Sequence, residues 1–409
     1  MRTRSRVKSW KREEIQSEIL PHLRIYAHTL LPLLLLLTSS AGAQNEQWLQ
    51  YRSAAEARQI VGDMGYDYRE VRAVKPQNVK LPEFKAQPLF HEWKTPMAAS
   101  GTIWLAFDKS NPNGQYDRLY IDANANGDLS DDPACEPYRR ESNMATFAPV
   151  KIVFNTADGP ITYHLSVELR VYPNETYCIL SPAGWYEGPV TVGGVKKHCV
   201  LIDYNVNGTF NDKSIDFEQC DRIRIGEEGG RDTRFVGNFI EVGDKLYRPE
   251  IAQDGAFVIV TEATDVSWGT VRLAENITSF GAGGVNGLFT RKPDKGIVKL
   301  PVGDYRVEHW TIAKIDDKGA KWELQAGTGG SGSFTVVPDQ EKEIPIGEPI
   351  YSLAEYRQSG SFYTFSQRLE GRQRERITLM RNGVQPPPPK LRIRSRDGAY
   401  DRGMSFEYG

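Results

Sequence analysis

The sequence predicts a mostly β protein with an antiparallel multi-module β-sandwich architecture and one N-terminal helix. From about Tyr66 onward, short runs alternate apolar and polar residues, as strands with one buried face do. Gly, Pro, Asn and Asp interrupt these runs, and the chain has 37 Gly and 24 Pro among 409 residues. Residues 46–61 have the spacing of an amphipathic helix that ends at Gly62. The elements other than this helix are therefore expected to be strands.

The expected strands fall into two series bounded by turn residues. The first series comprises residues 102–107, 149–154, 161–165, 167–172 and 257–261. The second runs over residues 305–315, turns at residues 316–319, and continues over 321–325 and 333–337, the pattern of a small sandwich. Four prolines at 386–389 form a stiff break before a last alternating segment, 390–396.

Residues 1–43 have the pattern of an export signal. Seven Lys and Arg precede an apolar run at 30–37, and Ala41, Gly42 and Ala43 form a small-x-small cleavage sequence. The run is too short to span a bilayer, and no later apolar segment is long enough to do so. We therefore expect cleavage after Ala43, a mature chain that begins at Gln44, and a secreted, periplasmic or cell-surface location without a transmembrane segment.

Charge is distributed unevenly along the chain. The formal charge is -2, but the basic leader and the basic residues 351–409 leave -11 on residues 44–350. An acidic body favours cation binding over nucleic-acid binding. We divide the chain into a signal peptide (1–43), an acidic β-rich body (44–235), a β-rich extension or linker (236–295), a small β-sandwich module (296–348) and a basic C-terminal β module (349–409).

One loop motif, D-x-N-x-N-G-x-[LF]-x-D, occurs twice in the acidic body. Oxygens at positions 1, 3 and 5 of a tight loop converge on one point, Gly at position 6 permits the reversal, the carbonyl of position 7 adds an oxygen, and a later carboxylate closes the shell. Such hard oxygen ligands suit Ca²⁺. The candidate ligands in the two loops are Asp122, Asn124, Asn126, Asp128 and Asp131, and Asp203, Asn205, Asn207, Thr209 and Asp212.

The loops depart from a helix-framed calcium sensor. The twelfth position is Pro133 in the first loop and Ser214 in the second, so the closing ligands are expected at Asp131 and Asp212, with Asp132 and Asp216 as the next candidates. The first loop carries more acidic residues and is expected to bind more tightly. In the alternative interpretation, Asn-Gly at each loop makes a hairpin turn that Asp122 or Asp203 caps through an Asx-turn.

These motifs carry two resemblances. The loops resemble the calcium loops of EF-hands and, more closely, the dockerin-like loops of secreted proteins. Residues 300–307, with the form LPxGxYxV, resemble the start of a strand in transthyretin-like (carboxypeptidase-regulatory-like) β-sandwich modules. As a whole the chain resembles secreted bacterial β-rich proteins that combine both features. That resemblance implies bound calcium and a sandwich module, but no known reaction.

Other candidate features leave alternatives open. Four cysteines in an oxidising compartment allow two disulfides with three possible pairings, or buried thiols. Trp185 and Tyr186 form either an exposed sugar-stacking pair or part of a core. Basic residues on one face of 390–396 make either a patch for anionic glycans or lipid headgroups or a solvated edge strand. Four scattered histidines after residue 43 make a zinc site improbable.

The function predicted from the sequence is that of an exported, non-enzymatic calcium-binding β protein. It would act as a surface or periplasmic binding or structural protein in which Ca²⁺ is structural. Beyond calcium, the candidate partners are a cell-surface glycan and another exported protein, and nucleic acid is not expected. The alternative is a secreted, glycan-active hydrolase with structural calcium, which would need two carboxylates about 5–10 Å apart in a cleft. The sequence nominates no catalytic residue.

Overall fold

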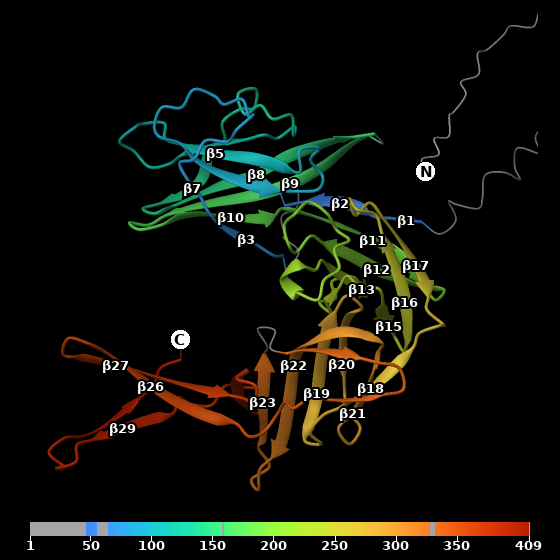
Figure 1. The fold of residues 1–409 in the computed structure, drawn as a ribbon, viewed down its shortest axis with the longest axis vertical. Coiled ribbons are helices and arrows are strands. Elements are labelled where there is room, and N and C mark those ends of the chain that lie inside the picture. The colour runs from blue at the N-terminus through green and yellow to red at the C-terminus, as the bar shows by residue number, and fades with distance from the viewer. Residues whose placement is uncertain (1–45, 55–63, 158, 328–331, 409) are drawn as a thin grey trace, which may run out of the picture. The chain divides into compact units, whose positions relative to one another are not determined.

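The computed structural model describes residues 46–54, 64–157, 159–327 and 332–408 (Figure 1). The predicted signal peptide and its cleavage site lie outside these residues. The described residues from Gln47 onward belong to one compact unit. Most of that unit is β-strand, and one short 3-10 helix, η1 (Phe217–Gln219), interrupts the strands.

The predicted fold class, mostly antiparallel β, is confirmed. Every strand pair of the described residues is antiparallel except β18 (Trp268–Arg272) with β25 (Glu341–Glu343). The predicted N-terminal helix does not begin where expected, because β1 (Gln47–Trp48) and β2 (Gln50–Ser53) are strands; residues 55–63 lie outside the described part. Tertiary pairing overrides the helical spacing: β1 pairs with one sheet and β2 with another.

Four sheets carry the first half of the fold. One sheet has the spatial order β3 (Asp67–Glu70), β10 (Thr176–Pro182), β9 (Gly159–Val171), β8 (Met144–Thr156) and β7 (Pro137–Glu141), and a second has the order β4 (Leu89–Lys94), β5 (Thr102–Asp108) and β6 (Arg118–Ile121). A third sheet has the order β14 (Arg234–Phe235), β13 (Arg222–Gly226), β12 (Val195–Ile202), β11 (Gly184–Val192) and β2. The fourth has the order β1, β17 (Phe257–Glu262), β16 (Lys245–Ile251) and β15 (Ile240–Val242).

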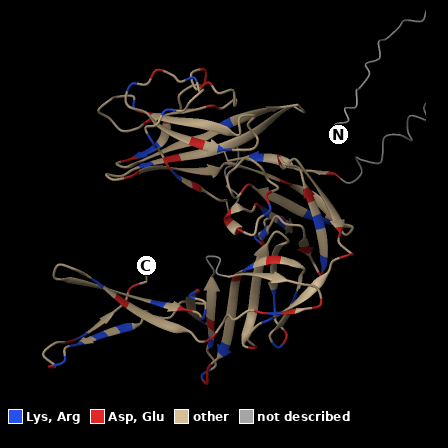
Figure 2. Cartoon of the chain, in the orientation of Figure 1, with Lys and Arg blue, Asp and Glu red and all other residues tan. Residues whose placement is uncertain are grey.

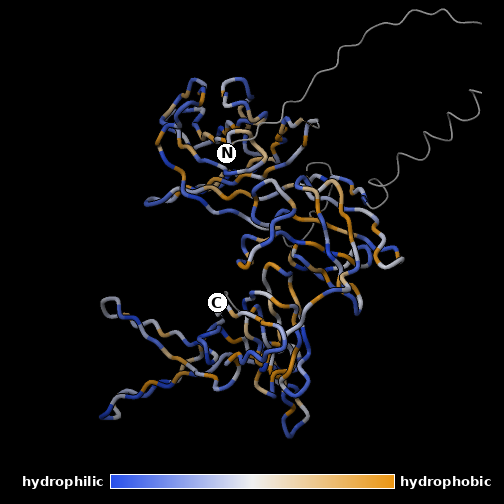
Figure 3. Tube along the Cα trace, turned by 45° about the vertical axis from the view of Figure 1, so that its right-hand side comes forward, coloured by the Kyte–Doolittle hydropathy of each residue, from blue (hydrophilic) through white to orange (hydrophobic). Residues whose placement is uncertain are grey.

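These four sheets contribute to one hydrophobic core, called here the first core. Its members run from Leu49 to Val258, and along β9 the buried Leu165, Val167 and Leu169 alternate with polar residues. Figure 3 colours the apolar residues of the strands orange and the polar residues blue. The sheet that contains β3 and β8 packs face to face against the sheet that contains β4 and β5. Between them, the ring centroids of Phe147 (β8) and Phe107 (β5) lie 6.2 Å apart. The period-2 pattern therefore predicted both the strands and their buried faces.

The strands of the remaining half of the described chain surround a second hydrophobic core. Its members run from Leu246 to Ile377. The strands that surround it are β21 (Ile297–Pro301), β18 and β25 in one sheet, and β20 (Gly287–Arg291), β19 (Ile277–Gly284), β22 (Gly303–Ile315), β23 (Lys321–Gly327), β28 (Arg376–Arg381), β27 (Phe362–Glu370) and β26 (Tyr351–Ser359) in another, with β24 (Ser333–Val336) also paired to β22.

The LPxGxYxV segment forms the corner between β21 and β22. Gly303 has φ +153°, and the Asn286 side chain occupies the place of a Cβ, with Nδ2 only 2.4 Å from that position. The buried Tyr305 hydroxyl donates to the Pro301 carbonyl at 2.8 Å, and Asn286 Nδ2 donates to that hydroxyl at 3.1 Å. This small hydrogen-bonded network explains why a glycine and a tyrosine stand two residues apart.

The sheets cross the module boundaries expected from the sequence. β19 and β20 come from residues 236–295, yet they pair into the same sheet as β22. β28 comes from residues 349–409 and pairs with β23 of that sheet. The predicted boundaries at residues 296 and 348 therefore fall within a continuous sheet rather than between separately paired modules.

The basic segment near the C-terminus is strand β29 (Lys390–Arg394), which forms a hairpin with β30 (Asp401–Ser405). Its Lys and Arg positions are blue along the ribbon in Figure 2. Arg392 makes a two-pronged ion pair with Asp401, with nitrogen-to-oxygen distances of 2.8 and 2.7 Å. One of the basic side chains on this face is thus neutralised within the hairpin itself.

The disulfides allowed by the cysteine count are not formed. All four cysteines carry free thiols; Cys178, Cys199 and Cys220 are buried and Cys135 is partly buried. They lie on different sheets and loops, and the Cys220 thiol donates to the Val236 carbonyl at 3.2 Å instead. Burial raises the pKa of the Cys199 thiol to about 12, which keeps it protonated and unreactive.

Candidate calcium loops and the cleft beside them

The two motif copies form loops that follow directly on strands. Asp122 is the first residue after β6, and Asp203 is the first residue after β12. We call residues 122–132 loop 1 and residues 203–212 loop 2. Neither loop is framed by helices, as the sequence predicted.

The loops share one set of hydrogen bonds. In loop 1, Asp122 Oδ1 accepts from the Asn126 amide at 2.9 Å and Oδ2 from the Gly127 amide at 2.8 Å. In loop 2, Asp203 accepts from the Asn207 and Gly208 amides in the same way, at 3.2 and 2.7 Å. The fifth-position side chains also match, because Asn126 Nδ2 donates to Asp131 at 2.8 Å and Asn207 Nδ2 donates to Asp212 at 2.7 Å.

The backbone of the loops repeats as well. The fourth positions, Ala125 and Val206, have φ values of +57° and +58°, and the glycines at the sixth positions, Gly127 and Gly208, have +81° and +89°. A left-handed backbone at a β-branched residue is uncommon and costs free energy, so the surrounding contacts must impose it. Two segments 81 residues apart in the sequence therefore fold into the same conformation.

Loop 2 places acidic groups in the protein interior. Asp203 and Asp221 are both fully buried, at 0% exposure. Burial raises the pKa of Asp203 to about 7, against the hydrogen bonds from Gly208, Tyr163 and Asn207. Burial and the neighbouring carboxylates of Asp203 and Asp212 raise the pKa of Asp221 well above its usual value. Among the described residues, no Lys or Arg forms an ion pair with any of these three carboxylates.

Loop 1 is more exposed and partly neutralised. Lys80 Nζ lies 2.6 Å from Asp128 Oδ2, and this contact lowers the pKa of Asp128 to about 2. Burial, opposed by a hydrogen bond from the Ala123 amide and helped by repulsion from nearby acidic residues, raises the pKa of Asp132 to about 6. Asp131 is exposed. Lys80 neutralises the negative charge of Asp128. The larger number of acidic residues in loop 1, which favoured this loop in the sequence, is therefore a smaller advantage for cation binding.

The structure brings most of the predicted ligands together within each loop. In loop 2 the predicted closing residue, Asp212, faces the other motif side chains, whereas the next candidate, Asp216, caps η1 and lies 3.7 Å from Arg306. Asp221, which the sequence did not nominate, supports the loop from behind: its Oδ1 accepts from the second-position amide, Tyr204, at 3.0 Å, and Oδ2 from the Asp212 amide at 2.8 Å.

Asp132 plays the corresponding part in loop 1, since it accepts from the Ala123 amide at 3.1 Å. Asp221 lies nine residues beyond Asp212, so no motif spacing points to it. Within the described residues, no group of three or more carboxylates, imidazoles or thiols lies close enough to hold a metal ion. A calcium shell in either loop must therefore include amide and carbonyl oxygens.

Large side chains of two sheets hold loop 2 in place. Tyr163 of β9 donates its hydroxyl to Asp203 Oδ2 at 2.8 Å, and Trp93 of β4 donates Nε1 to the Val206 carbonyl at 2.6 Å. The two rings stack on each other with centroids 5.6 Å apart. At Gly65 a Cβ would lie 1.7 Å from the Tyr204 carbonyl oxygen, so only glycine lets the chain before β3 approach the loop.

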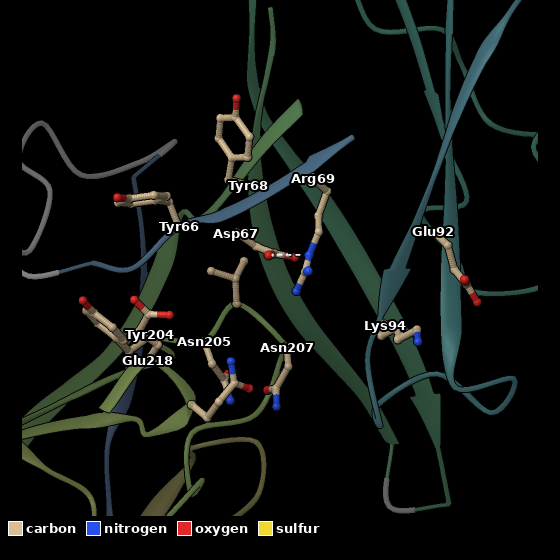
Figure 4. A pocket seen from close by; sticks show the side chains of 12 residues that line it. Tyr66, Asp67, Tyr68, Arg69, Glu92, Lys94, Tyr204, Asn205, Asn207 and Glu218 are labelled. Carbon is tan, nitrogen blue, oxygen red and sulfur yellow. Dashed lines mark ion pairs between the residues drawn. The ribbon is translucent and has the colours of Figure 1, made fainter. Parts of the chain in front are cut away.

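A cleft of about 630 Å³ lies beside loop 2 (Figure 4). Its walls come from β3 and the residue before it, from β4, from the loop and from η1. The lining residues are Tyr66, Asp67, Tyr68, Arg69, Glu92, Lys94, Tyr204, Asn205, Val206, Asn207, Glu218 and Gln219. The sequence did not nominate this cleft, because its walls come from four separate segments.

The edges of β3 and β4 shape the cleft. Beyond the end of β3, Arg72 and Phe90 exchange backbone hydrogen bonds of 3.0 and 2.7 Å, which close the gap between the two edge strands. Toward Asp67 and Lys94 the strands are not paired, and the cleft occupies this space. Figure 4 shows the ion pair between Asp67 and Arg69 above loop 2; its nitrogen-to-oxygen distance is 2.7 Å.

Comparisons of this chain with protein-family models, with curated proteins and with solved structures gave no match. In the part of the chain that the structure describes, no helix has the length and apolar character needed to cross a bilayer.

Proposed function

We propose that this chain is an exported, non-enzymatic binding protein whose body is stabilised by Ca²⁺ at loops 1 and 2. The observation that carries the proposal is the shared conformation of the two loops, with the same hydrogen bonds to the same motif positions. A hairpin turn alone requires the Asn-Gly step, but it does not require the repeated Asp at the tenth position or the second carboxylate on the second-position amide.

The residues of loop 2 fit a hard divalent cation. Asn205 Oδ1 is buried and lacks a hydrogen-bond partner in the described structure, and it stands at the third motif position, where a calcium ligand is expected. Asp203 and Asp221 are buried carboxylates whose pKa values are raised, first by burial and then by like charge, from Asp212 on Asp203 and from Asp203 and Asp212 on Asp221. A cation bound among them would offset this repulsion and favour their ionised forms.

The hydrogen bonds at Asp212 show what a cation would replace. Three donors meet at Asp212 Oδ2: Thr209 Oγ1 at 2.6 Å, Asn207 Nδ2 at 2.7 Å and Asn205 Nδ2 at 3.2 Å. A half-turn of either amide about χ2 would present its oxygen in place of its nitrogen. The proposed ion therefore competes with these hydrogen bonds, and because loop 2 is more buried than loop 1, we propose that it is the tighter site.

Calcium titration of the full mature chain should give two sites. Asp212→Asn removes a charge from loop 2 at nearly constant shape, and Asp131→Asn does the same in loop 1, so each should reduce the calorimetric stoichiometry by one. Binding should raise the free energy of unfolding by about 2.7 kcal/mol per site at a hundredfold excess of Ca²⁺ over the dissociation constant.

Asp216→Asn is the matched control, because Asp216 is a neighbouring, partly exposed carboxylate outside the loop hydrogen bonds. It should leave the stoichiometry at two. An unchanged stoichiometry in the double variant of Asp131 and Asp212 would contradict the proposal, and so would an absence of calcium binding by the unaltered chain.

Export makes a separate prediction about the mature N-terminus. Since residues 1–43 carry a basic start, a short apolar run and a small-x-small sequence, a signal peptidase should cleave after Ala43. Mass spectrometry of the protein recovered from the exporting cell should identify a first peptide that begins at or near Gln44. Recovery of a product that retains Arg24 would contradict export by cleavage.

A further inference from the structure

We infer that the cleft beside loop 2 is a carbohydrate-binding site for an uncharged oligosaccharide. This inference rests on the proposal that the chain is a binding protein, but not on calcium. It names the class of ligand and the residues that would hold it.

Aromatic rings and polar groups lie side by side in the cleft. A sugar ring has an apolar C–H face and a rim of hydroxyls, each of which both donates and accepts hydrogen bonds. Tyr66 and Tyr68 line the cleft with 71% and 48% exposure, so both rings are open to a ligand that enters it. The hydroxyls would meet carboxylates, amides and cationic side chains from the other walls (Figure 4).

Planar polar groups in and beside the cleft are partly fixed before a ligand arrives. Asp67 and Arg69 form an ion pair, with 2.7 Å between Asp67 Oδ1 and Arg69 Nε. The guanidinium carbon of Arg222 lies 3.7 Å from the centroid of the Tyr204 ring. Groups already held in place lose little conformational entropy on binding. Paired donors and acceptors of this kind match vicinal hydroxyls.

The charges of the residues that line the cleft nearly cancel. Asp67, Glu92 and Glu218 are acidic, and Arg69 and Lys94 are basic, which leaves a slight negative excess. Stacked tyrosines can also hold nucleic-acid bases, but such sites need a cationic groove for the phosphates. The lining therefore disfavours phosphates and nucleic acids and suits a ligand without charge.

The aromatic surface continues beyond the cleft. The Tyr68 ring points away from loop 2 in Figure 4 and lies 4.0 Å from the Tyr177 ring, which in turn stacks with Tyr172 at 5.8 Å. Tyr172 is 37% exposed. A sugar chain that leaves the cleft over Tyr68 would thus meet a second exposed ring, so the ligand is an oligosaccharide rather than a single sugar.

The test is direct binding to the full mature chain. Cellohexaose, maltohexaose, chitohexaose and a hexamer of galacturonic acid are titrated beside their disaccharides, with a single-stranded oligothymidine and an extended lysine-rich peptide as competing classes. At least one uncharged hexasaccharide should bind, more tightly than its disaccharide and with little dependence on salt, because no net charge is neutralised.

Three tyrosine variants locate the site. Tyr66→Ala and Tyr68→Ala should each weaken hexasaccharide binding by about tenfold or more, the loss expected for one stacked ring. Tyr172→Ala should weaken hexasaccharide but not disaccharide binding. Tyr138→Ala is the matched control, because Tyr138 lies on β7 outside the cleft and is 69% exposed, like Tyr66.

The outcomes separate this inference from the proposed function. Failure of every uncharged hexasaccharide to bind, tighter binding of the oligothymidine or the peptide, or equal affinity in Tyr66→Ala and the unaltered chain would overturn it. Oligosaccharide binding by a chain that binds no calcium would support the inference while refuting the calcium proposal. Cleavage of a bound hexasaccharide, abolished by Glu92→Gln or Glu218→Gln, would support a carbohydrate site in this cleft but would contradict the non-enzymatic part of the proposed function.

Discussion

Replacing Trp93 with alanine should lower the free energy of unfolding of the first core by about 3–5 kcal/mol. The side chain is 1% exposed, and its ring lies 5.6 Å from Tyr163 and 6.3 Å from Phe154 between centroids. The substitution removes these contacts and leaves a cavity between two sheets. It also leaves the Val206 carbonyl of loop 2 without its donor, which adds an unsatisfied polar group in the interior.

Hydrogen exchange read by mass spectrometry, together with denaturant unfolding, would measure this effect. Trp93→Phe keeps an aromatic ring but removes the N–H donor, so it should cost about 1–3 kcal/mol and loosen loop 2 more than the strands. Trp48→Ala is the control on an exposed ring, at 64% exposure. If Trp93→Ala cost no more than Trp48→Ala, the indole would not be the anchor of loop 2.

The strands could be predicted because their signal is local. β24 and β29 each show the alternation within a few residues, and the turn at Asp316 is closed by its own side chain, which accepts from the Lys318 and Ala320 amides. The helix prediction was wrong in the described residues for the opposite reason. Residues 47–53 pair with strands about 130 to 210 positions away, and no local pattern reports such partners.

In the candidate site, too, the local features could be predicted from the sequence and the features set by distant residues could not. The motif predicted, through the Asx-turn interpretation, the capping hydrogen bonds that the two loops share, because Asp122 and Asp203 accept from amides only four and five positions ahead. It could not predict Asp221, whose role depends on the return of the chain after η1. It also could not predict that Trp185 and Tyr186 are buried, at 4% and 8% exposure, whereas Tyr66 and Tyr68 are the exposed rings beside a cleft.

Buried His91 offers a pH-dependent test of the packing behind that cleft. It lies on β4 opposite Leu105, is 7% exposed, and its Nε2 has no hydrogen-bond partner among the described residues. Burial lowers the pKa of His91 to about 4, with Arg69 acting in the same direction and Asp67 and the Glu70 backbone opposing it. The imidazole is therefore neutral in the folded protein at pH values where the unfolded chain already carries the proton.

His91 should make the protein progressively less stable between pH 6.5 and about pH 4. Its folded pKa is lower than its unfolded value, so the stability present above pH 6.5 is lost as the unfolded chain takes up the proton, and the loss levels off below pH 4. A shift of this size corresponds to about 3 kcal/mol. Carboxylates titrate in the same range, so the measured quantity is the difference in unfolding free energy between the unaltered chain and His91→Leu at pH 7, 5.5 and 4. His91→Leu should gain about 3 kcal/mol relative to the unaltered chain over this interval. A difference that stays constant with pH would mean that water or a side chain solvates the imidazolium in the folded state, and that the interior behind the cleft is open.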